Sequence, residues 1–566
     1  MIATRWLTRP GPESEAAEPP TEAEKPASAA DDSPSWLRPS LVFWTSTLAI
    51  AAAAMIRSGY LFTRPIHEQG DDALNSLLAG RAEHFELLIG NYSRVGFHHP
   101  GPALLYMLGG GSAFFHGLLH VAPTPYNGEL LGAITFAAAL IGLAVLAVYR
   151  CTRSVAASVV LATICFAFAA NHAMFGDSWF PYLYMAPFLL FVVAGAAVAA
   201  GYTVELPSFL LAAGVLAHGH VSFLMFVGVT AVAVAAGWVV RHRREWRAEL
   251  GAHRRATFGG LALVALFLLP VILELVLHYP GPWQAYRDYV SHPNPPRDAG
   301  DVARFFRWYW SDATLPVALT VIAAVVAGTL MIIDRRRIFG FLYAMLALQS
   351  ILFLVYIARG VDVLDAHNRY VGFFYLTVPL LLVAAASAHL AMWLAQWLAQ
   401  RLSARGEHWR YAVGGAAVAT AVAVLVAGAV ATQHARDRYR ALPDYPRLVT
   451  ALDRAPDRHG RVAAFDFAHD RWPEAAGIGV AAQRQHVPWC ISNARWTNLF
   501  TGNYICKASY HQWTLAIVLS NEIPRSAAVI WRDDKIAVIE RDPAAPPLPA
   551  YAQPPVTASL RAPRRG

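Results

Sequence analysis

Two adjacent carboxylates, Asp71 and Asp72, lie in a polar stretch of the sequence, residues 61–102, that hydrophobic segments flank. A carboxylate can act as a general base that accepts the proton of an attacking hydroxyl group, and transfer of a group from an anionic leaving group needs cationic help as well. Neighbouring side chains on a regular element point in different directions, so one aspartate would face an acceptor while the other contacts a cation or a donor. The alternative is that both cap a helix beginning near Ala73, where acidic groups are favoured.

Further polar residues follow in the same stretch and at later places in the chain. We expect the following to contact the substrate or its donor: Arg94, His98, His99, Asp177, His218, His220, Arg369 and Tyr370. One of His98 and His99 is expected to face the reaction centre. A guanidinium binds phosphate through two parallel hydrogen bonds, which favours Arg369 as the phosphate contact, with Arg94 as a competing candidate. The alternative is that Arg369 and Tyr370 anchor a helix end at the membrane interface.

The other candidates have structural alternatives as well. His218 and His220 flank a glycine between apolar segments; paired imidazoles are metal ligands or phosphate partners, whereas a buried histidine in a helical core is usually structural. Asp177 precedes Ser-Trp-Phe-Pro, so a turn with an interfacial aromatic residue is its alternative. A divalent cation is a candidate cofactor, with Asp71, Asp72 and Asp177 as its candidate ligands.

The composition of the chain is that of a membrane protein. Of its 566 residues, 56% are hydrophobic and 15% are charged, and the hydrophobic residues fall in separate runs. Runs of about 18 to 25 apolar residues are long enough to cross the hydrocarbon core as helices. The formal net charge of +8 comes from short arginine clusters between those runs, as the positive-inside bias produces. We therefore expect a lipid bilayer as partner and reject a nucleic-acid partner.

The hydrophobic runs predict about eleven membrane crossings. They cover roughly residues 41–56, 130–149, 154–171, 184–201, 206–219, 221–240, 259–278, 315–333, 338–357, 371–395 and 412–432. Residues 103–121 are assigned to the first external loop, because a crossing there would place Arg150 and Arg153 outside. This topology puts the arginine clusters on the cytoplasmic side of the membrane and nearly all the candidate site residues on the external side.

The crossings divide the chain into three regions. We expect a disordered cytoplasmic tail at residues 1–36, a transmembrane domain at 37–435 with a large first external loop at 57–128, and an extracytoplasmic domain at 436–566. Alternating segments at residues 461–468, 527–531 and 536–540 predict strands, so the last region should be a small α/β or α+β domain.

Cysteine placement agrees with an extracytoplasmic third region. Cys490 and Cys506 both lie there, and outside the cytoplasm they can form a disulfide. Cys151 and Cys165 lie at or in predicted helices and are most simply small apolar residues.

One hydrophobic span, then a long loop with an early acidic pair and a later His-Pro segment, resembles the polytopic GT-C glycosyltransferases, which take sugars from polyprenyl-phosphate donors. The run GNYSRVGFHHPGP at residues 90–102 is similar to actinobacterial-type arabinofuranosyltransferases. The resemblance covers residues 37–435 as architecture. It implies an inverting transferase of the bacterial inner membrane that moves a sugar, with arabinofuranose the first candidate, to an extracytoplasmic glycan, lipid or protein acceptor.

A transporter or lipid flippase is the main alternative function. A transporter is expected to carry ionisable residues near mid-membrane on broken helices and to consist of two related halves. In this sequence the polar groups gather on one predicted face, and no internal repeat is evident. A scaffold whose external domain binds a wall polymer is a third interpretation.

Overall fold

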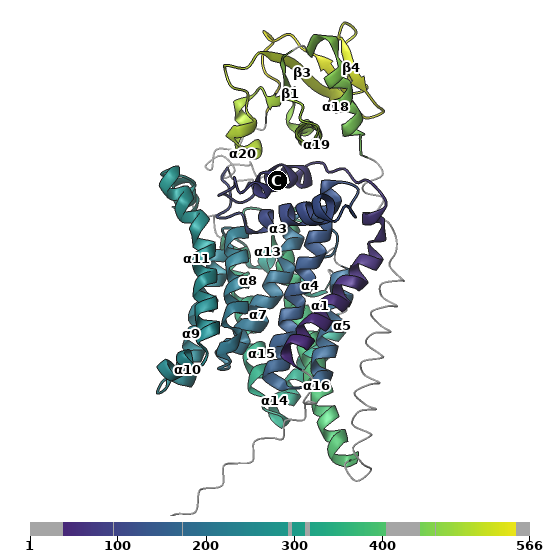
Figure 1. The fold of residues 1–566 in the computed structure, drawn as a ribbon. Coiled ribbons are helices and arrows are strands. Elements are labelled where there is room, and N and C mark those ends of the chain that lie inside the picture. Colours follow the sequence, from purple (N-terminus) through teal and green to yellow (C-terminus); the bar gives the residue numbers. More distant parts are fainter. Residues whose placement is uncertain are drawn as a thin grey trace, which may run out of the picture.

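The computed structural model describes residues 38–93, 96–171, 174–291, 297–311, 317–402, 442–458 and 460–550. A bundle of helices carries a small α/β domain at one end, and helices of the first loop lie between the two (Figure 1). The predicted tail at residues 1–36 and the last predicted crossing at 412–432 lie outside the described residues.

Seven of the described helical segments are long and apolar enough to cross a membrane. They comprise α1 (Pro39–Arg57), α4 (Pro125–Thr152), α6 with α7 (Phe180–Leu183 and Met185–Ala199), α9 (Phe223–His242), α11 (Arg254–Leu277), α15 (Arg337–Arg359) and η4 with α16 (His367–Leu376 and Thr377–Leu402). Shorter apolar helices are α3 (Ala103–Gly111) with η2 (Ser112–Leu118), α5 (Val155–Asn171), α8 (Leu206–Gly219) and α14 (Val317–Ile333). Each predicted crossing within the described residues coincides with one of these helices, so the chain is a multi-pass membrane protein.

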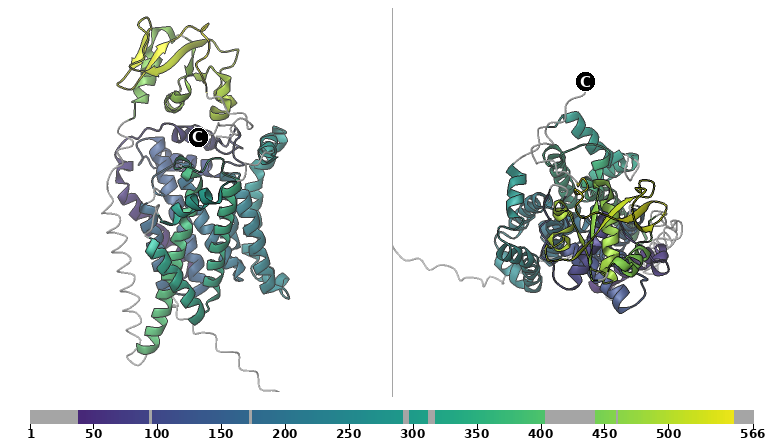
Figure 2. Two further views of the ribbon diagram at one scale, coloured as in Figure 1. Left: turned by 180° about the vertical axis from the view of Figure 1, so that it is seen from behind. Right: turned by 90° about the horizontal axis from the view of Figure 1, so that it is seen from above.

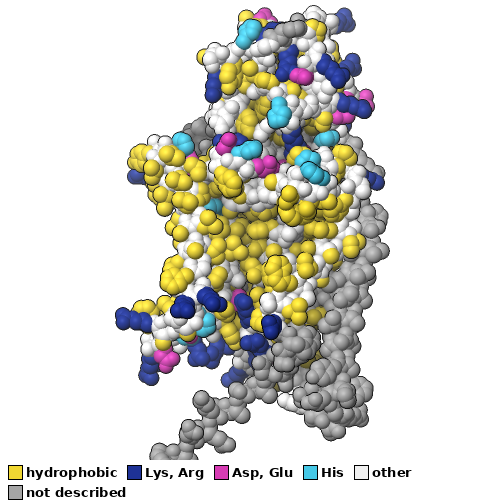
Figure 3. Space-filling view, in the orientation of Figure 1, with side chains coloured by type: hydrophobic (Ala, Val, Ile, Leu, Met, Phe, Trp, Pro, Cys, Tyr) yellow, Lys and Arg dark blue, Asp and Glu magenta, His cyan; other side chains and the backbone are white. Residues whose placement is uncertain are grey.

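The helices differ in how much of their surface the protein covers. The apolar window of α6–α7 is 94% buried and that of α4 is 78% buried, whereas α11 is only 6% buried. An apolar helix without protein neighbours on most sides suits a lipid environment. On the face shown in Figure 3, hydrophobic side chains form a band along the bundle, and Lys and Arg side chains gather below it over α10 (Trp246–Ala252).

The first loop leaves and re-enters the bundle at the same end. The Asn127 side chain, in the first turn of α4, accepts a hydrogen bond from the Ile66 N–H (3.1 Å) and donates one to the Leu61 carbonyl (2.8 Å). Residues 103–118 therefore belong to a loop whose first and last residues lie together at one end of the helix bundle. The end of α3 packs tightly on α4, because a Cβ on Gly111 would come within 2.7 Å of the Gly132 Cα.

The C-terminal domain is an α/β domain built on a five-stranded sheet of order β2-β1-β3-β5-β4. The strands are β1 (Val462–Phe467), β2 (Trp489–Ile491), β3 (Gln512–Leu519), β4 (Val529–Arg532) and β5 (Ile536–Glu540), and the helices are α18 (Tyr445–Arg454), α19 (Trp472–Arg484) and α20 (Thr497–Phe500). β1 is parallel to β2 and β3, and β5 is antiparallel to β3 and β4. The predicted α/β character is confirmed. β1, β4 and β5 match the predicted strands, and β2 and β3 are additional.

A disulfide joins Cys490 at β2 to Cys506, with their Cα atoms 4.9 Å apart. It links the strand to the segment that follows α20. This is the pairing that the sequence suggested.

The C-terminal domain sits on the first-loop helix α2 (Asp71–Glu83), and α19 lies over it in both side views (Figures 1 and 2). Leu74 and Leu77 of α2 belong to the same hydrophobic cluster as the core of the C-terminal domain. The opposite face of α2 packs into the bundle through Leu78 and Ala82. Since both faces of α2 are covered, its N-terminus is fixed relative to both parts of the protein.

Candidate active site

α2 begins at Asp71, directly after Gly70, whose φ of +62° is a conformation that favours glycine. The Gly70 N–H donates a hydrogen bond of 3.2 Å to the Pro473 carbonyl at the start of α19. Asp71 and Asp72 thus occupy the first turn, where the helix dipole favours negative charge, as the capping alternative expected. Their side chains also contact distant elements.

Both carboxylate oxygens of Asp71 accept hydrogen bonds from aromatic side chains. Oδ1 accepts one from the Tyr92 hydroxyl, and Oδ2 accepts one from Trp179 Nε1 at 2.8 Å. Burial and the negative charge of Asp71 raise the pKa of Tyr92 well above its ordinary value, so the phenol keeps its proton and remains a donor. Asp71 is half-buried, and its carboxylate is oriented from two sides.

Asp72 and Asp177 are buried more deeply. Asp72 is 8% exposed and accepts a hydrogen bond from the Ser178 hydroxyl (2.9 Å). Asp177 is completely buried and accepts one from the Trp179 N–H (2.9 Å), which closes a turn. Asp177 therefore orients Trp179, and Trp179 in turn orients Asp71.

An aromatic wall continues from Trp179 to η4, the segment that carries Arg369 and Tyr370. The Trp179 and Tyr370 ring centroids are 5.2 Å apart. The Arg369 guanidinium lies 4.6 Å from the centre of the Trp308 ring, and the Arg369 carbonyl accepts a hydrogen bond of 2.6 Å from the Tyr309 hydroxyl. The Trp179 indole thus contacts both the Asp71 carboxylate and the Tyr370 ring, and the neighbouring Arg369 guanidinium stacks on a second indole, that of Trp308.

The histidines form a second group at the far end of the loop. His99 is 3% exposed, and its ring centroid lies 4.1 Å from that of His220. Burial, and then the neighbouring His220, lower the pKa of His99 well below its ordinary value. A ring nitrogen of His218 lies 2.6 Å from the Phe267 carbonyl, and Gly101 packs so closely on this ring that a Cβ would overlap it. His99 and His218 therefore tie the loop to α8 and α11.

His98 differs from its neighbour His99, because its ring lines a cavity. Its Nδ1 lies 3.0 Å from the Gly90 carbonyl, and its own carbonyl accepts a hydrogen bond from Tyr286. Arg94, the competing phosphate contact, lies outside the described residues.

The three aspartates do not fit a divalent-cation site built on all of them. Within the described part of the chain, no group of three or more His, Cys, Asp or Glu side chains is placed to hold a metal ion. Both Asp71 oxygens already accept hydrogen bonds, and Asp72 and Asp177 face different donors.

Residues that the sequence analysis overlooked hold this region together. Tyr92 and Trp179 orient Asp71, and Arg484 of α19 lies 2.6 Å from a Glu68 carboxylate oxygen and 3.5 Å from one of Glu129. Glu68 and Glu129 are 3% and 2% exposed. Glu129 gave a signal in the sequence, since a carboxylate at the start of an apolar run is costly without a partner. No pattern in the sequence around Arg484 predicted its contacts with Glu68 and Glu129.

Comparison with solved structures identifies the architecture. The chain is similar to ArnT from Cupriavidus metallidurans in the apo state, with a TM-score of 0.53 and 13% identity over 92% of this chain and 99% of that one. ArnT bound to undecaprenyl phosphate matches with a TM-score of 0.46 and 14% identity over 88% and 98% of the two chains. The apo oligosaccharyltransferase of Archaeoglobus fulgidus matches with a TM-score of 0.37 and 13% identity over 84% and 69%.

No family model matches the sequence, and no curated protein does. The match to apo ArnT covers nearly all of both chains, so the shared fold includes the helical bundle and the C-terminal domain. The predicted architecture, a polytopic helical domain followed by a small α/β domain, is therefore confirmed. At 13% identity the likeness is one of fold.

Proposed function

We propose that this chain is a membrane glycosyltransferase that moves a sugar from a polyprenyl-phosphate donor to an acceptor hydroxyl, with Asp71 as the base. The observation that carries the proposal is the half-buried Asp71 carboxylate, oriented by Tyr92 and Trp179 beside an aromatic wall. ArnT, with whose apo form the chain shares its fold, binds undecaprenyl phosphate, so a polyprenyl phosphate is the first carrier to test.

Asp71 suits the role of base better than Asp72. A carboxylate oxygen has two lone pairs, so each Asp71 oxygen can accept a proton while keeping its present hydrogen bond. Asp72 is 8% exposed and faces Ser178, which leaves little room for an acceptor. We assign proton acceptance to Asp71 and support of the turn at Ser178 to Asp72.

In the proposed reaction, Asp71 takes the proton of the acceptor hydroxyl, and the acceptor oxygen bonds to the anomeric carbon of the donor sugar. The bond from that carbon to the phosphate oxygen breaks, and polyprenyl phosphate leaves. Attack opposite the leaving group inverts the anomeric centre. Arg369 stabilises the negative charge that develops on the phosphate, and the rings of Trp179 and Tyr370 offer apolar faces to the sugar.

The finer assignments follow from the sequence and extend this proposal. Arabinofuranose is the first sugar to test, because of the resemblance at residues 90–102, and the acceptor is an extracytoplasmic glycan, lipid or protein. The arginine-rich end of the bundle over α10 lies opposite the C-terminal domain (Figures 1 and 3). The positive-inside bias supports an orientation in which that end faces the cytoplasm of a bacterial inner membrane and Asp71 lies on the outer side.

The test is a purified-protein assay with a panel of radiolabelled polyprenyl-phosphate sugars, in which decaprenyl-phosphate arabinofuranose is one member. Asp71→Asn keeps the size of the side chain but removes its capacity to accept a proton, so transfer should fall by about 10²-fold or more while donor binding is retained. Asp534→Asn, on the exposed surface of the C-terminal domain, is the matched control and should keep full activity.

Wild-type protein that transfers no sugar in any member of the panel, or Asp71→Asn protein with normal turnover, would refute the proposal. Movement of an unchanged lipid across vesicles without sugar transfer would favour the flippase alternative.

A further inference from the structure

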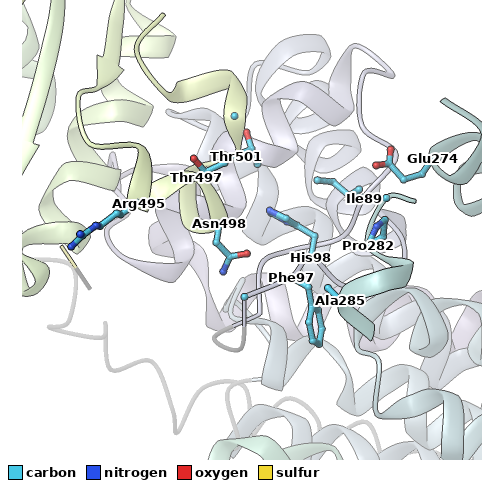
Figure 4. Close-up of a pocket in the computed structure, with 13 residues that line it drawn as sticks. Ile89, Phe97, His98, Glu274, Pro282, Ala285, Arg495, Thr497, Asn498 and Thr501 are labelled. Carbon is cyan, nitrogen blue, oxygen red and sulfur yellow. The ribbon is translucent and has the colours of Figure 1, made fainter. Parts of the chain in front are cut away.

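A cavity of about 870 Å³ lies between the C-terminal domain and the turn from α11 to α12 (Trp283–Ser291), as Figure 4 shows. Its size falls in the range of about 300 to 1,000 Å³ that small-ligand sites occupy. His98 is one of the described residues that line it, whereas Asp71, Tyr92 and Trp179 are not. The cavity is therefore separate from the carboxylate site.

The two walls of this cavity differ in chemistry. The C-terminal domain contributes the polar side chains of Arg495, Thr497 and Asn498, and the opposite wall contributes the apolar Pro282 and Ala285. Figure 4 shows His98 between the two walls. A ligand with hydroxyl groups on one face and C–H groups on the other satisfies both walls, and a sugar ring has this character.

The charges at the cavity favour a neutral ligand. Arg495 brings one positive charge, and Glu274, which lies 2.9 Å from His278 Nδ1, brings one negative charge. Phosphate binds through charge-assisted hydrogen bonds to cations, and at this cavity the Glu274 carboxylate offsets the only cationic side chain among the described lining residues. The donor phosphate is therefore better served by Arg369 than by this cavity.

Thr501, which also lines the cavity, has an unusual backbone. Its φ of +61° with ψ of 161° is a conformation that a β-branched residue rarely adopts, and the residue is 8% exposed. Such strain persists where the surrounding structure imposes it and gathers at ligand sites. Here it accompanies the turn from α20 to Gly502 that shapes the polar wall.

One backbone bridge, between Tyr92 and His98, borders both the cavity and the Asp71 site. Tyr92 and His98 pair as an antiparallel bridge, so the same hairpin presents the Tyr92 hydroxyl to Asp71 and the His98 ring to the cavity. Asn498 Nδ2 donates a hydrogen bond of 3.1 Å to the Ser93 carbonyl, which fixes the hairpin to the polar wall.

From these contacts we infer that the cavity is the acceptor subsite and binds a neutral, hydroxyl-rich glycan chain. This inference rests on the proposed function, and it selects a glycan among the possible acceptors. The body of the acceptor chain lies along the polar wall of the C-terminal domain, and its reacting hydroxyl extends past the Tyr92–His98 bridge to Asp71.

The experiment is photo-cross-linking of the full-length chain in its host cells. Benzoylphenylalanine replaces Ala285 on the apolar wall or, as the matched control, Gln284, which is exposed on the same helix and does not line the cavity. After irradiation, the purified protein is stained for periodate-oxidised carbohydrate and analysed by mass spectrometry. A carbohydrate adduct at position 285 and none at 284 is expected. A lipid or protein adduct alone at 285, no adduct, or equal carbohydrate adducts at both positions would overturn the inference.

A kinetic arm separates this inference from the proposed function. Ala285→Trp should fill the cavity and lower transfer from labelled donor to the glycan-bearing fraction of host membranes by about tenfold or more, whereas Gln284→Trp should not. Donor binding should stay unchanged in both variants. If the wild-type protein transfers sugar and Ala285→Trp does so equally well, the cavity is not the acceptor subsite although the enzyme assignment stands. If wild-type protein transfers none while the adduct still forms, the proposed function fails and glycan binding remains.

Discussion

The two ends of the polar stretch at residues 61–102 place their ionisable groups in opposite surroundings. At the start of this stretch, Asp71 receives hydrogen bonds from Tyr92 and Trp179 and stays half-exposed. At its end, His99 is packed against His220 and is only 3% exposed, and burial lowers its pKa. Hydrogen-bond donors orient the carboxylate while it stays accessible, whereas the imidazole is enclosed by its neighbours. The comparison shows that surroundings, rather than residue type, decide which ionisable group is accessible.

The largest effect should come from the contact that holds the carboxylate end in place. Arg484→Gln leaves Glu68 and Glu129 buried without their cation, which should cost about 3–5 kcal/mol of stability. Thermal unfolding of the purified protein measures this change. Glu129→Gln is the matched control and should cost less, because Glu68 still faces the arginine. Equal melting temperatures for Arg484→Gln and wild type would mean that this ion cluster does not hold the domains together.

Arg369 tests whether donor phosphate belongs to the carboxylate end. Arg369→Gln removes a charge-assisted contact worth about 1.5–3 kcal/mol, so donor binding should weaken by roughly tenfold to a hundredfold. Equilibrium binding of a labelled polyprenyl-phosphate sugar provides the measurement. Arg495→Gln, in the cavity on the other side of the hairpin, should leave donor affinity unchanged. A larger loss for Arg495→Gln than for Arg369→Gln would move the phosphate to the histidine end of the loop.

Trp179 tests the orientation of Asp71. Trp179→Phe keeps an aromatic ring beside Tyr370 but removes the Nε1–H donor, so turnover should fall by about tenfold, the value of roughly one charged hydrogen bond. The rate constant should change more than the donor affinity, because the ring that meets the sugar remains. Tyr92→Phe should behave alike. Normal turnover in both variants would show that Asp71 needs neither donor.

The smallest effect is expected at the histidine end. Burial lowers the pKa of His99 in the folded protein. Below about pH 6.5 the unfolded chain therefore binds a proton at this residue that the folded chain does not, so the protein becomes less stable as the pH decreases. His99→Phe should therefore reduce the loss of melting temperature between pH 7.5 and 5.0 and change turnover by less than about threefold. A hundredfold loss of turnover in this variant would restore His99 to the reaction centre.

The sequence by itself determined the elements whose signal is local. Runs of apolar residues have to be long enough to span a hydrocarbon core, and each crossing predicted within the described residues is a helix in the structure. Alternation marked β1, β4 and β5. It missed β3, because Leu515–Leu519 is a continuous apolar run in the middle of the sheet, which periodicity does not distinguish from a helix.

Only the tertiary structure decided which of the candidate residues meet. Asp71 and Asp72 are neighbours in the chain, but their side chains point about 100° apart around the helix axis. The packing of α2 between two domains buries Asp72 and leaves Asp71 reachable. Trp179 lies 108 residues from Asp71, and Arg484 lies 355 residues from Glu129. These contacts depend on how helices and a sheet pack in space, and no local pattern encodes a distance between segments so far apart.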